Sequence, residues 1–139
     1  MRWRDEDGRS LVEFALCASA LFLMTFGLMG ICFALYSYNF VAEAARDASR
    51  YAMVRGSSCT GFSDCSITSA QLQTYVQNLS YPGIYPGNLT ATASWSPSNA
   101  PGGVVTVIVT YQFPLNIPFW PRTGTVLHMA SASEMTISQ

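Results

Sequence analysis

Few side chains in this 139-residue sequence have the chemistry or the spacing of a functional site. The single histidine, His128, has no acidic residue close to it in sequence, so no acid–base pair is indicated. A zinc site needs clustered Cys and His ligands, which Cys59 and Cys65 with one distant histidine do not supply. Phosphate-binding glycine loops, nucleophile elbows and nucleic-acid motifs are absent. The sequence predicts no enzyme, no cofactor or metal, and no nucleic-acid or small-molecule partner.

Two of the four cysteines have the placement of a disulfide. Cys59 and Cys65 lie in a polar loop rich in Ser and Gly, where two thiols are a liability unless they are paired. Pairing needs an oxidising compartment, so this part of the chain is predicted to lie outside the cytoplasm. The bond would close a loop of about seven residues and stabilise the fold by roughly 2 kcal/mol. Two free thiols are the alternative, whereas Cys17 and Cys32 are interpreted as small apolar residues.

Glu13 is the third residue whose position is unusual, because it stands at the start of a long apolar run. No Asp, Glu, Lys or Arg occurs between Phe14 and Ala42, although charged residues make up 11% of the chain. A carboxylate at this place costs up to a few kcal/mol in a membrane, and less near the interface than at the bilayer centre. It is either a helix-capping residue near the headgroups or a group with a specific partner.

The apolar run itself predicts a membrane-spanning helix from about Phe14 to Tyr36. Its roughly 23 residues would reach about 35 Å as a helix, and a bilayer core is about 30 Å thick. A buried core helix is the first alternative, but the rest of the chain is too small to surround it. A signal peptide cut after Ala44, in Ala42-Glu43-Ala44, is the second, although its apolar region would be about 7–15 residues.

The elements around these residues divide the chain into three parts. Residues 1–8 (MRWRDEDG) form a short charged leader, and residues 9–55 a long helix that starts near Ser10, with Glu13 completing a capping box. Beyond the span, a stripe of mainly small residues faces charged ones at helical spacing. The stripe consists of Val41, Ala44, Ala45, Ala48, Tyr51 and Ala52, and the charged residues are Glu43, Arg46, Asp47 and Arg50.

Residues 56–139 are predicted to form a small α+β domain. A short helix over 69–79 has Leu72, Val76 and Leu79 on one face. Strands are expected over 89–95, 104–113 and 125–137, with Val105, Val107, Val109, Tyr111 and Phe113 sharing one face of the second. The segment 114–124 (PLNIPFWPRTG) is expected to be irregular. An antiparallel three-stranded sheet would then cover the exposed half of the long helix.

The leader and the helix start together resemble a known family. Gly8-Arg9-Ser10-Leu11-Val12-Glu13 is similar to a class III (type IV pilin-like) leader, with a glycine followed five residues later by a glutamate that opens an apolar helix. GRSLVEFAL, together with AARDASRYA at 44–52 and the later VTVIVTYQF, resembles the TadE-like minor pilins (pseudopilins) of tight-adherence, or Flp, pili. The resemblance covers the first 55 residues well and the remainder loosely. Arg9 departs from the apolar first mature residue of ordinary type IV pilins.

This resemblance implies a structural role in pilus assembly and surface attachment. It implies that a prepilin peptidase cuts between Gly8 and Arg9, and that Glu13 serves assembly, where it could meet the new α-ammonium of its own or a neighbouring chain. The implied partners are other pilins or pseudopilins, the pilus assembly platform, the peptidase and the membrane. The implied location is the bacterial inner membrane, crossed once, with a cytoplasmic N-terminus and an extracytoplasmic domain. Whether the chain enters the filament stays open.

Two other functions remain as alternatives. The chain would be a membrane-anchored extracytoplasmic binding module if its leader stays uncut, and an unrecognised secreted enzyme released after Ala44 if the run is a signal peptide. Arginines flank the run almost equally, with Arg2, Arg4 and Arg9 before it and Arg46, Arg50 and Arg55 after it. The positive-inside rule therefore nearly ties, and the predicted orientation depends on the cysteines.

Overall fold

The computed structural model describes residues 4–79, 81–114 and 126–138, with side chains described from Gly8 onward. The elements, in chain order, are α1 (Arg4–Met53), α2 (Ser69–Asn78), the 3-10 turn η1 (Pro86–Asn88), β1 (Leu89–Ser96), β2 (Val104–Pro114) and β3 (Val126–Thr136). The predicted α+β class, with one long helix, one short helix and a three-stranded antiparallel sheet, is confirmed.

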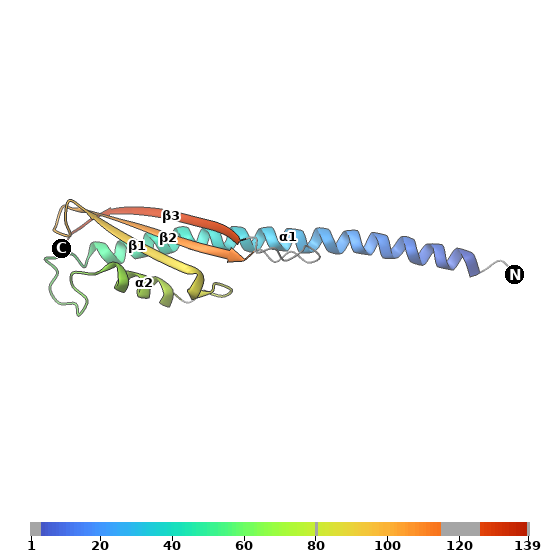
Figure 1. Cartoon of the computed structure of the whole chain (residues 1–139), viewed down its shortest axis with the longest axis horizontal. Helices are drawn as coiled ribbons and strands as arrows, with labels where there is room; N and C mark the ends of the chain where they lie inside the picture. Colours follow the sequence, from blue (N-terminus) through green and yellow to red (C-terminus); the bar gives the residue numbers. More distant parts are fainter. Residues whose placement is uncertain (1–3, 80, 115–125, 139) are drawn as a thin grey trace.

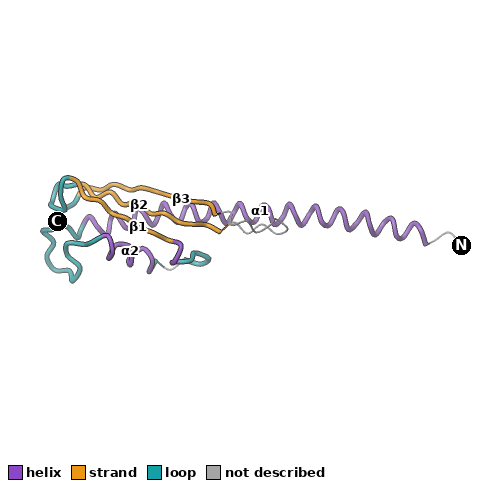
Figure 2. The backbone as a smooth tube through the Cα atoms, viewed as in Figure 1, coloured by secondary structure: helices purple, strands orange, loops and turns teal. Residues whose placement is uncertain are grey.

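The helix α1 is a single rod that runs through the whole length of the molecule (Figures 1 and 2). Its 50 residues correspond to about 75 Å at helical rise. The sheet and α2 lie along its C-terminal part, and the N-terminal part extends alone beyond them (Figure 1). One end of the helix is therefore part of a domain, while the other has no described neighbour.

The sheet has the strand order β1-β2-β3, with both pairs antiparallel. The register places Thr92 opposite Ile108 and Ile108 opposite Ala132, so these three residues form one row across the sheet. Alternating side chains of β2 are buried and exposed, as the sequence of this strand predicts. The strand runs one residue further than predicted, because Pro114 pairs with Val126.

The core lies between the inner face of the sheet, α2 and the predicted stripe of small residues on α1. Alanine has the smallest side chain that still favours a helix, so a row of alanines lets the sheet approach the helix closely. The fully buried apolar residues of the core include Val41, Ala45, Ala48, Ala52, Leu72, Val76, Val105, Val107 and Val109. Tyr51, which was predicted to belong to the stripe, is only partly buried and packs against the edge of this cluster.

The short helix α2 begins with a capping box that the sequence interpretation did not identify. Thr68 accepts a hydrogen bond from the Gln71 backbone N–H, and the Gln71 side chain accepts one from the Thr68 N–H. These two bonds satisfy donors that the first turn of a helix leaves open. They orient α2 so that Leu72 and Val76 are buried against the sheet.

The start of the long helix differs from the prediction. The predicted capping box at Ser10 and Glu13 is wrong, because α1 already begins at Arg4 and passes through Gly8 without a break. The helix ends at Met53, two residues before the expected Arg55. Residues 115–124 of the predicted irregular segment, and Thr125, lie outside the described residues.

Candidate assembly site

Gly8 lies inside α1, on the exposed surface of the helix. A Cβ atom placed on Gly8 would meet no atom within 4 Å. Glycine inside a helix is less favourable than alanine by about 1 kcal/mol, so this position lowers helix stability without relieving a steric clash. The described fold therefore gives no structural reason for glycine at residue 8.

Glu13 lies on the same exposed helix, next to the apolar side chains of Leu11, Val12 and Phe14. Among the described residues it has no hydrogen-bond or ion-pair partner, and Arg9, four residues earlier, is not within ion-pair distance of it. Four residues of helix correspond to a rise of about 6 Å, so the two residues lie one turn apart. The fold of the single chain thus leaves this carboxylate available to another group.

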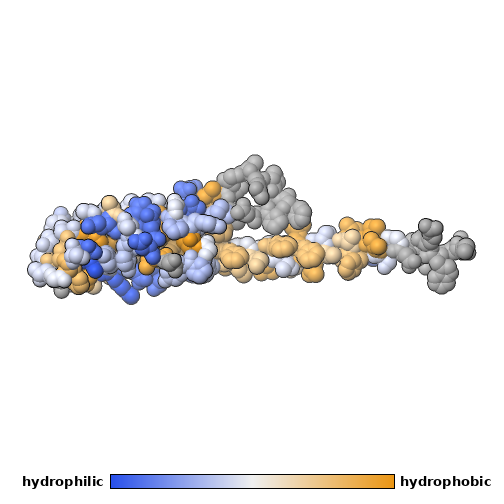
Figure 3. All heavy atoms as spheres, turned by 90° about the horizontal axis from the view of Figure 1, so that it is seen from below, coloured by the Kyte–Doolittle hydropathy of each residue, from blue (hydrophilic) through white to orange (hydrophobic). Residues whose placement is uncertain are grey.

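The surface of α1 after Glu13 is bare and apolar. The described helix from Gly8 to Met53 contains a window with a mean hydropathy of 2.1, none of it buried in the molecule, and by length and composition it can cross a membrane. Figure 3 shows this part as a largely apolar rod outside the domain. Leu11 and Phe14 expose 70% and 74% of their surface, which is far more than a soluble core helix would leave in water.

The few polar side chains on this rod have partners within the helix. The Ser19 hydroxyl donates to the Leu16 carbonyl and the Thr25 hydroxyl to the Leu21 carbonyl, both at 2.8 Å. Hydroxyl groups that are bonded in this way need no water, so they are tolerated in hydrocarbon. Glu13, just before this stretch, has no such partner for its charge among the described residues.

Four tyrosines are exposed at or near the end of the apolar run. Tyr36 and Tyr38 lie on α1, whereas Tyr81 and Tyr85 belong to the turn that follows α2, and the four expose between 40% and 65% of their surface. The Tyr85 N–H also donates to the Tyr111 hydroxyl at 3.4 Å, which connects this turn to β2. Tyrosine is enriched at membrane–water interfaces, so these residues are suited to lie at such an interface.

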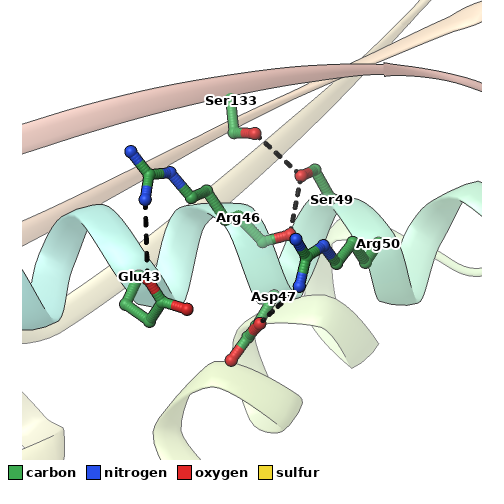
Figure 4. Close-up of polar contacts among 6 residues, drawn as sticks. All are labelled: Glu43, Arg46, Asp47, Ser49, Arg50 and Ser133. Carbon is green, nitrogen blue, oxygen red and sulfur yellow. Dashed lines mark hydrogen bonds and ion pairs between the residues drawn. The ribbon is translucent and has the colours of Figure 1, made fainter.

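A polar contact joins the C-terminal part of α1 to the sheet, and ion pairs lie near it on the helix (Figure 4). The Ser49 hydroxyl donates to the Arg46 carbonyl, and the Ser49 and Ser133 oxygens are 2.8 Å apart. On the outer side of the helix, Arg46 pairs with Glu43 at 3.6 Å and Arg50 with Asp47 at 3.9 Å. Exposed pairs of this kind contribute little to stability, so these charges mainly keep the outer face of α1 polar.

The disulfide loop lies beyond the end of α1. Cys59 and Cys65 are joined by a disulfide, as the sequence predicts, whereas Cys17 and Cys32 are free and exposed on the apolar part of the helix. The Arg55 guanidinium lies between two aromatic rings, 3.6 Å from the Tyr51 centroid and 4.8 Å from that of Phe62. This stacking packs the loop against the helix end, and cation–π contacts of this kind are stabilising.

Tyr51 connects the same cluster to α2 and to the loop. Its ring stacks on Tyr75 at 4.0 Å, and its hydroxyl donates to an Asp64 carboxylate oxygen at 3.2 Å. Burial raises the pKa of the Tyr51 phenol; the nearby Arg55 lowers it less, and the Asp64 hydrogen bond raises it further. Burial likewise raises the pKa of Tyr75, and Asp47 adds to this. Both phenols therefore remain protonated in the folded domain to higher pH than usual.

Comparison with protein families identifies the part of the chain that carries these features. Residues 8–50 match the family of TadE-like proteins. The N-terminal part of this chain is therefore similar to TadE-like proteins. The match begins at Gly8, contains Glu13 and the apolar rod, and ends at Arg50, in the part of α1 that packs on the sheet. Most of the domain therefore lies outside the match. No curated protein and no solved structure matches the chain.

The sequence-predicted site residues of this chain fall into two separate groups. Gly8, Arg9 and Glu13 lie together on the first turns of α1, whereas the cysteine pair lies beyond its other end. Sequence interpretation missed the Arg55 cluster, because Tyr51 and Phe62 are brought together only by the turn after α1. Within the described residues, no group of three His, Cys, Asp or Glu side chains is placed to hold a metal ion.

Proposed function

We propose that this chain is a TadE-like minor pilin, or pseudopilin, that takes part in assembling a Flp (tight-adherence) pilus for surface attachment. The match of residues 8–50 to TadE-like proteins supports involvement in a pilus of this kind. The observation that carries the finer role is Glu13, an unpartnered carboxylate on a bare apolar helix. Such a helix is stable in lipid, and the carboxylate gains when a positive group of another subunit pairs with it.

We further propose that the chain is matured by a prepilin peptidase cutting between Gly8 and Arg9. The support is that Gly8 weakens an exposed helix without any steric need, which is expected if a peptidase must approach the backbone closely. Cleavage would leave a new α-ammonium one helical turn from Glu13. It would also leave Ser10 near the new helix start, where a hydroxyl can cap the first turn.

The orientation and the partners follow from the same proposal. The chain crosses the inner membrane once, with its N-terminus in the cytoplasm and the domain after about residue 56 outside. The disulfide supports this orientation, because a stable structural disulfide is expected in an oxidising compartment. The partners are other pilins, the assembly platform and the peptidase. A reporter that is active only outside the cytoplasm, fused after Gln139, is expected to be active, and an inactive fusion at normal expression would reverse the topology.

The test of maturation compares two glycines of the same helix. Gly8→Val should leave the chain eight residues longer, with residues 1–8 still attached, because the β-branched side chain hinders the peptidase. Gly27→Val is the matched control, since a Cβ at Gly27 also meets no atom within 4 Å. Intact-mass measurement on protein isolated from its own membrane should find the control shortened. If both variants are shortened alike, Gly8 is not the processing residue.

A further inference from the structure

The two edges of the sheet are not equivalent. At the β1 edge, α2 supplies side chains that bond the strand's backbone: the Ser69 hydroxyl donates to the Ala93 carbonyl at 3.0 Å, and the Gln77 amide donates to the Leu89 carbonyl at 3.3 Å. In the part of the chain that the structure describes, no side chain or strand bonds the outer edge of β3. Figure 1 shows β3 as the border of the sheet, with α2 beside β1.

The hydrogen bonds at the end of β3 identify which of its backbone groups face outward. Ile137 bonds toward β2, because its N–H donates to Gly103 at 2.8 Å and its carbonyl accepts from Gly102 at 2.9 Å. Successive residues of an antiparallel strand direct these groups to alternate sides. Ser131, Ser133 and Met135 therefore also face β2, and Ala130, Ala132 and Glu134 offer N–H and C=O groups to the open edge. The same alternation directs the Leu89 and Ala93 carbonyls outward, toward the donors from α2.

This edge lacks the features that usually protect an open strand. Proteins discourage edge pairing with lysine, proline, bulges or very short strands, and β3 has eleven residues in unbroken register with no lysine, proline or bulge. Near the centre of β3, the residues whose backbone groups face the open edge are Ala130 and Ala132, and their small side chains leave the backbone accessible. Glu134 carries the one negative charge among the described residues of the strand, and it accepts a hydrogen bond from Thr106 at 3.2 Å.

A symmetric pair of copies of this chain cannot join through their β3 edges and remain anchored in the same membrane. β3 runs in the same direction as α1, because Ser133 contacts Ser49 and Ser138 donates to Met53 at 3.1 Å. Antiparallel pairing of two β3 edges would therefore direct the two apolar rods in opposite directions. In a parallel pair related by a twofold axis along the strands, each residue would lie level with the same residue of the other copy. The outward N–H and C=O groups of the two strands would then face each other at the same height, whereas the slanted bonds of a parallel ladder need them offset. The β1 edge of another copy is bonded by its own α2.

We propose that β3 binds an extended segment of a different protein in the extracytoplasmic space, which adds a fourth strand to the sheet. Backbone hydrogen bonds to Ala130, Ala132 and Glu134 supply the affinity, as in other strand-addition complexes. The small side chains of Ala130 and Ala132 favour a partner strand with bulky apolar residues beside them. Glu134 favours a Lys or Arg near one end of the bound segment. This inference does not depend on cleavage at Gly8.

Residue-resolved hydrogen exchange tests this proposal on the full chain. The outward amides of Ala130, Ala132 and Glu134 should exchange about tenfold or more slowly in membranes of the producing cells than in the purified detergent-solubilised chain. The inward amides of Ser131 and Ser133 should be protected in both samples. Equal exchange of the outward amides in the two samples would overturn the proposal.

Photo-crosslinking distinguishes the occupants. A benzophenone side chain at Ala132 should form an adduct with another protein, whereas the same group at Thr92 should not, because Thr92 lies in the same row at the opposite edge. An adduct of two copies of this chain would contradict the proposed occupant. Equal adducts from both positions would show that the partner covers the face of the sheet, and no adduct from Ala132 would also overturn the proposal.

A backbone substitution completes the test. Ala132→Pro removes one outward N–H and is tolerated at a strand edge, so the protection of Ala130 and Glu134 gained in membranes should be lost. Ala132→Val keeps the N–H, so the Ala130 and Glu134 amides of this variant should still be protected in membranes. Unchanged protection of Ser131 and Ser133 in the purified protein shows that the strand still folds. If proline disrupts it, Ala132→Lys provides the second variant, since an edge lysine opposes strand addition. Wild-type protection in a folded variant of either kind would contradict the proposal.

Discussion

Ser49 of α1 and Ser133 of β3 share a hydrogen bond across the core, with their hydroxyl oxygens 2.8 Å apart. The proton of Ser49 is used toward the Arg46 carbonyl, so Ser133 is the donor in this contact. Ser49 is fully buried among residues that are otherwise apolar. Together with the apolar core, the contact helps to set how far the sheet lies along the helix, and with it how far the apolar rod extends beyond the domain.

Removing one partner of this bond should destabilise the domain measurably. Ser133→Ala leaves the Ser49 hydroxyl bonded to Arg46 and should cost about 1 kcal/mol in the free energy of unfolding. The double variant Ser49→Ala/Ser133→Ala should cost little more than one substitution, because no unpaired hydroxyl remains. Denaturant unfolding of the full chain in detergent measures both. Ser94→Ala, on the exposed face of β1, is the control, and full additivity of the pair would contradict the assigned contact.

The disulfide should be present in the native protein and should contribute to its stability. Mass mapping of an unreduced digest is expected to find Cys59 linked to Cys65, and the variant Cys59→Ser/Cys65→Ser should lose roughly 2 kcal/mol of unfolding free energy. Cys17→Ser/Cys32→Ser is the matched control and should unfold as the wild type does. A linkage of either loop cysteine to Cys17 or Cys32 would show that the pairing is wrong.

The partly buried phenols of Tyr51 and Tyr75 predict how stability changes at alkaline pH. Burial raises the pKa of Tyr51 and Tyr75 above the ordinary value of 10.0, so the unfolded chain releases these protons first. Their contribution is fully present below about pH 10 and is lost as the pH rises through the folded-state pKa values. Unfolding free energies measured from pH 8 to 11 should fall with pH. The double variant Tyr51→Phe/Tyr75→Phe should fall less steeply, and equal slopes would contradict this explanation.

Several elements could be predicted from the sequence because their patterns are local. The alternation from Val105 to Tyr111 predicts a strand with one buried face, and the alanine stripe predicts the side of α1 that the sheet covers. The helix start could not be predicted from Ser10 and Glu13, because a capping residue is effective only where the backbone leaves the helix. The sequence pattern alone gave no reason to prefer Arg4.

The candidate site divides in the same way. Glu13 is conspicuous in sequence because one acid precedes a long apolar run, and its lack of a partner follows from the bare helix around it. The Arg55 cluster and the open edge of β3 depend on contacts between residues far apart in the chain. Neither has a local sequence pattern, so only the fold shows them.

Glu13 should be needed for assembly and not for maturation. Glu13→Ala leaves the bond between Gly8 and Arg9 unchanged, so the variant should be shortened normally, and its insertion should improve as the carboxylate cost disappears. Surface piliation, or co-purification with other pilus components, should be lost. Ser19→Ala, on the same apolar rod, is the control and should assemble. Normal piliation with Glu13→Ala would contradict the assembly role.

The mass of the wild-type N-terminus tests the central claim most directly. Protein isolated from the membrane of its own cells, with a functioning prepilin peptidase present, is predicted to begin at Arg9. A chain that still begins at Met1 under these conditions would contradict the pilin-like function and favour an anchored extracytoplasmic binding module.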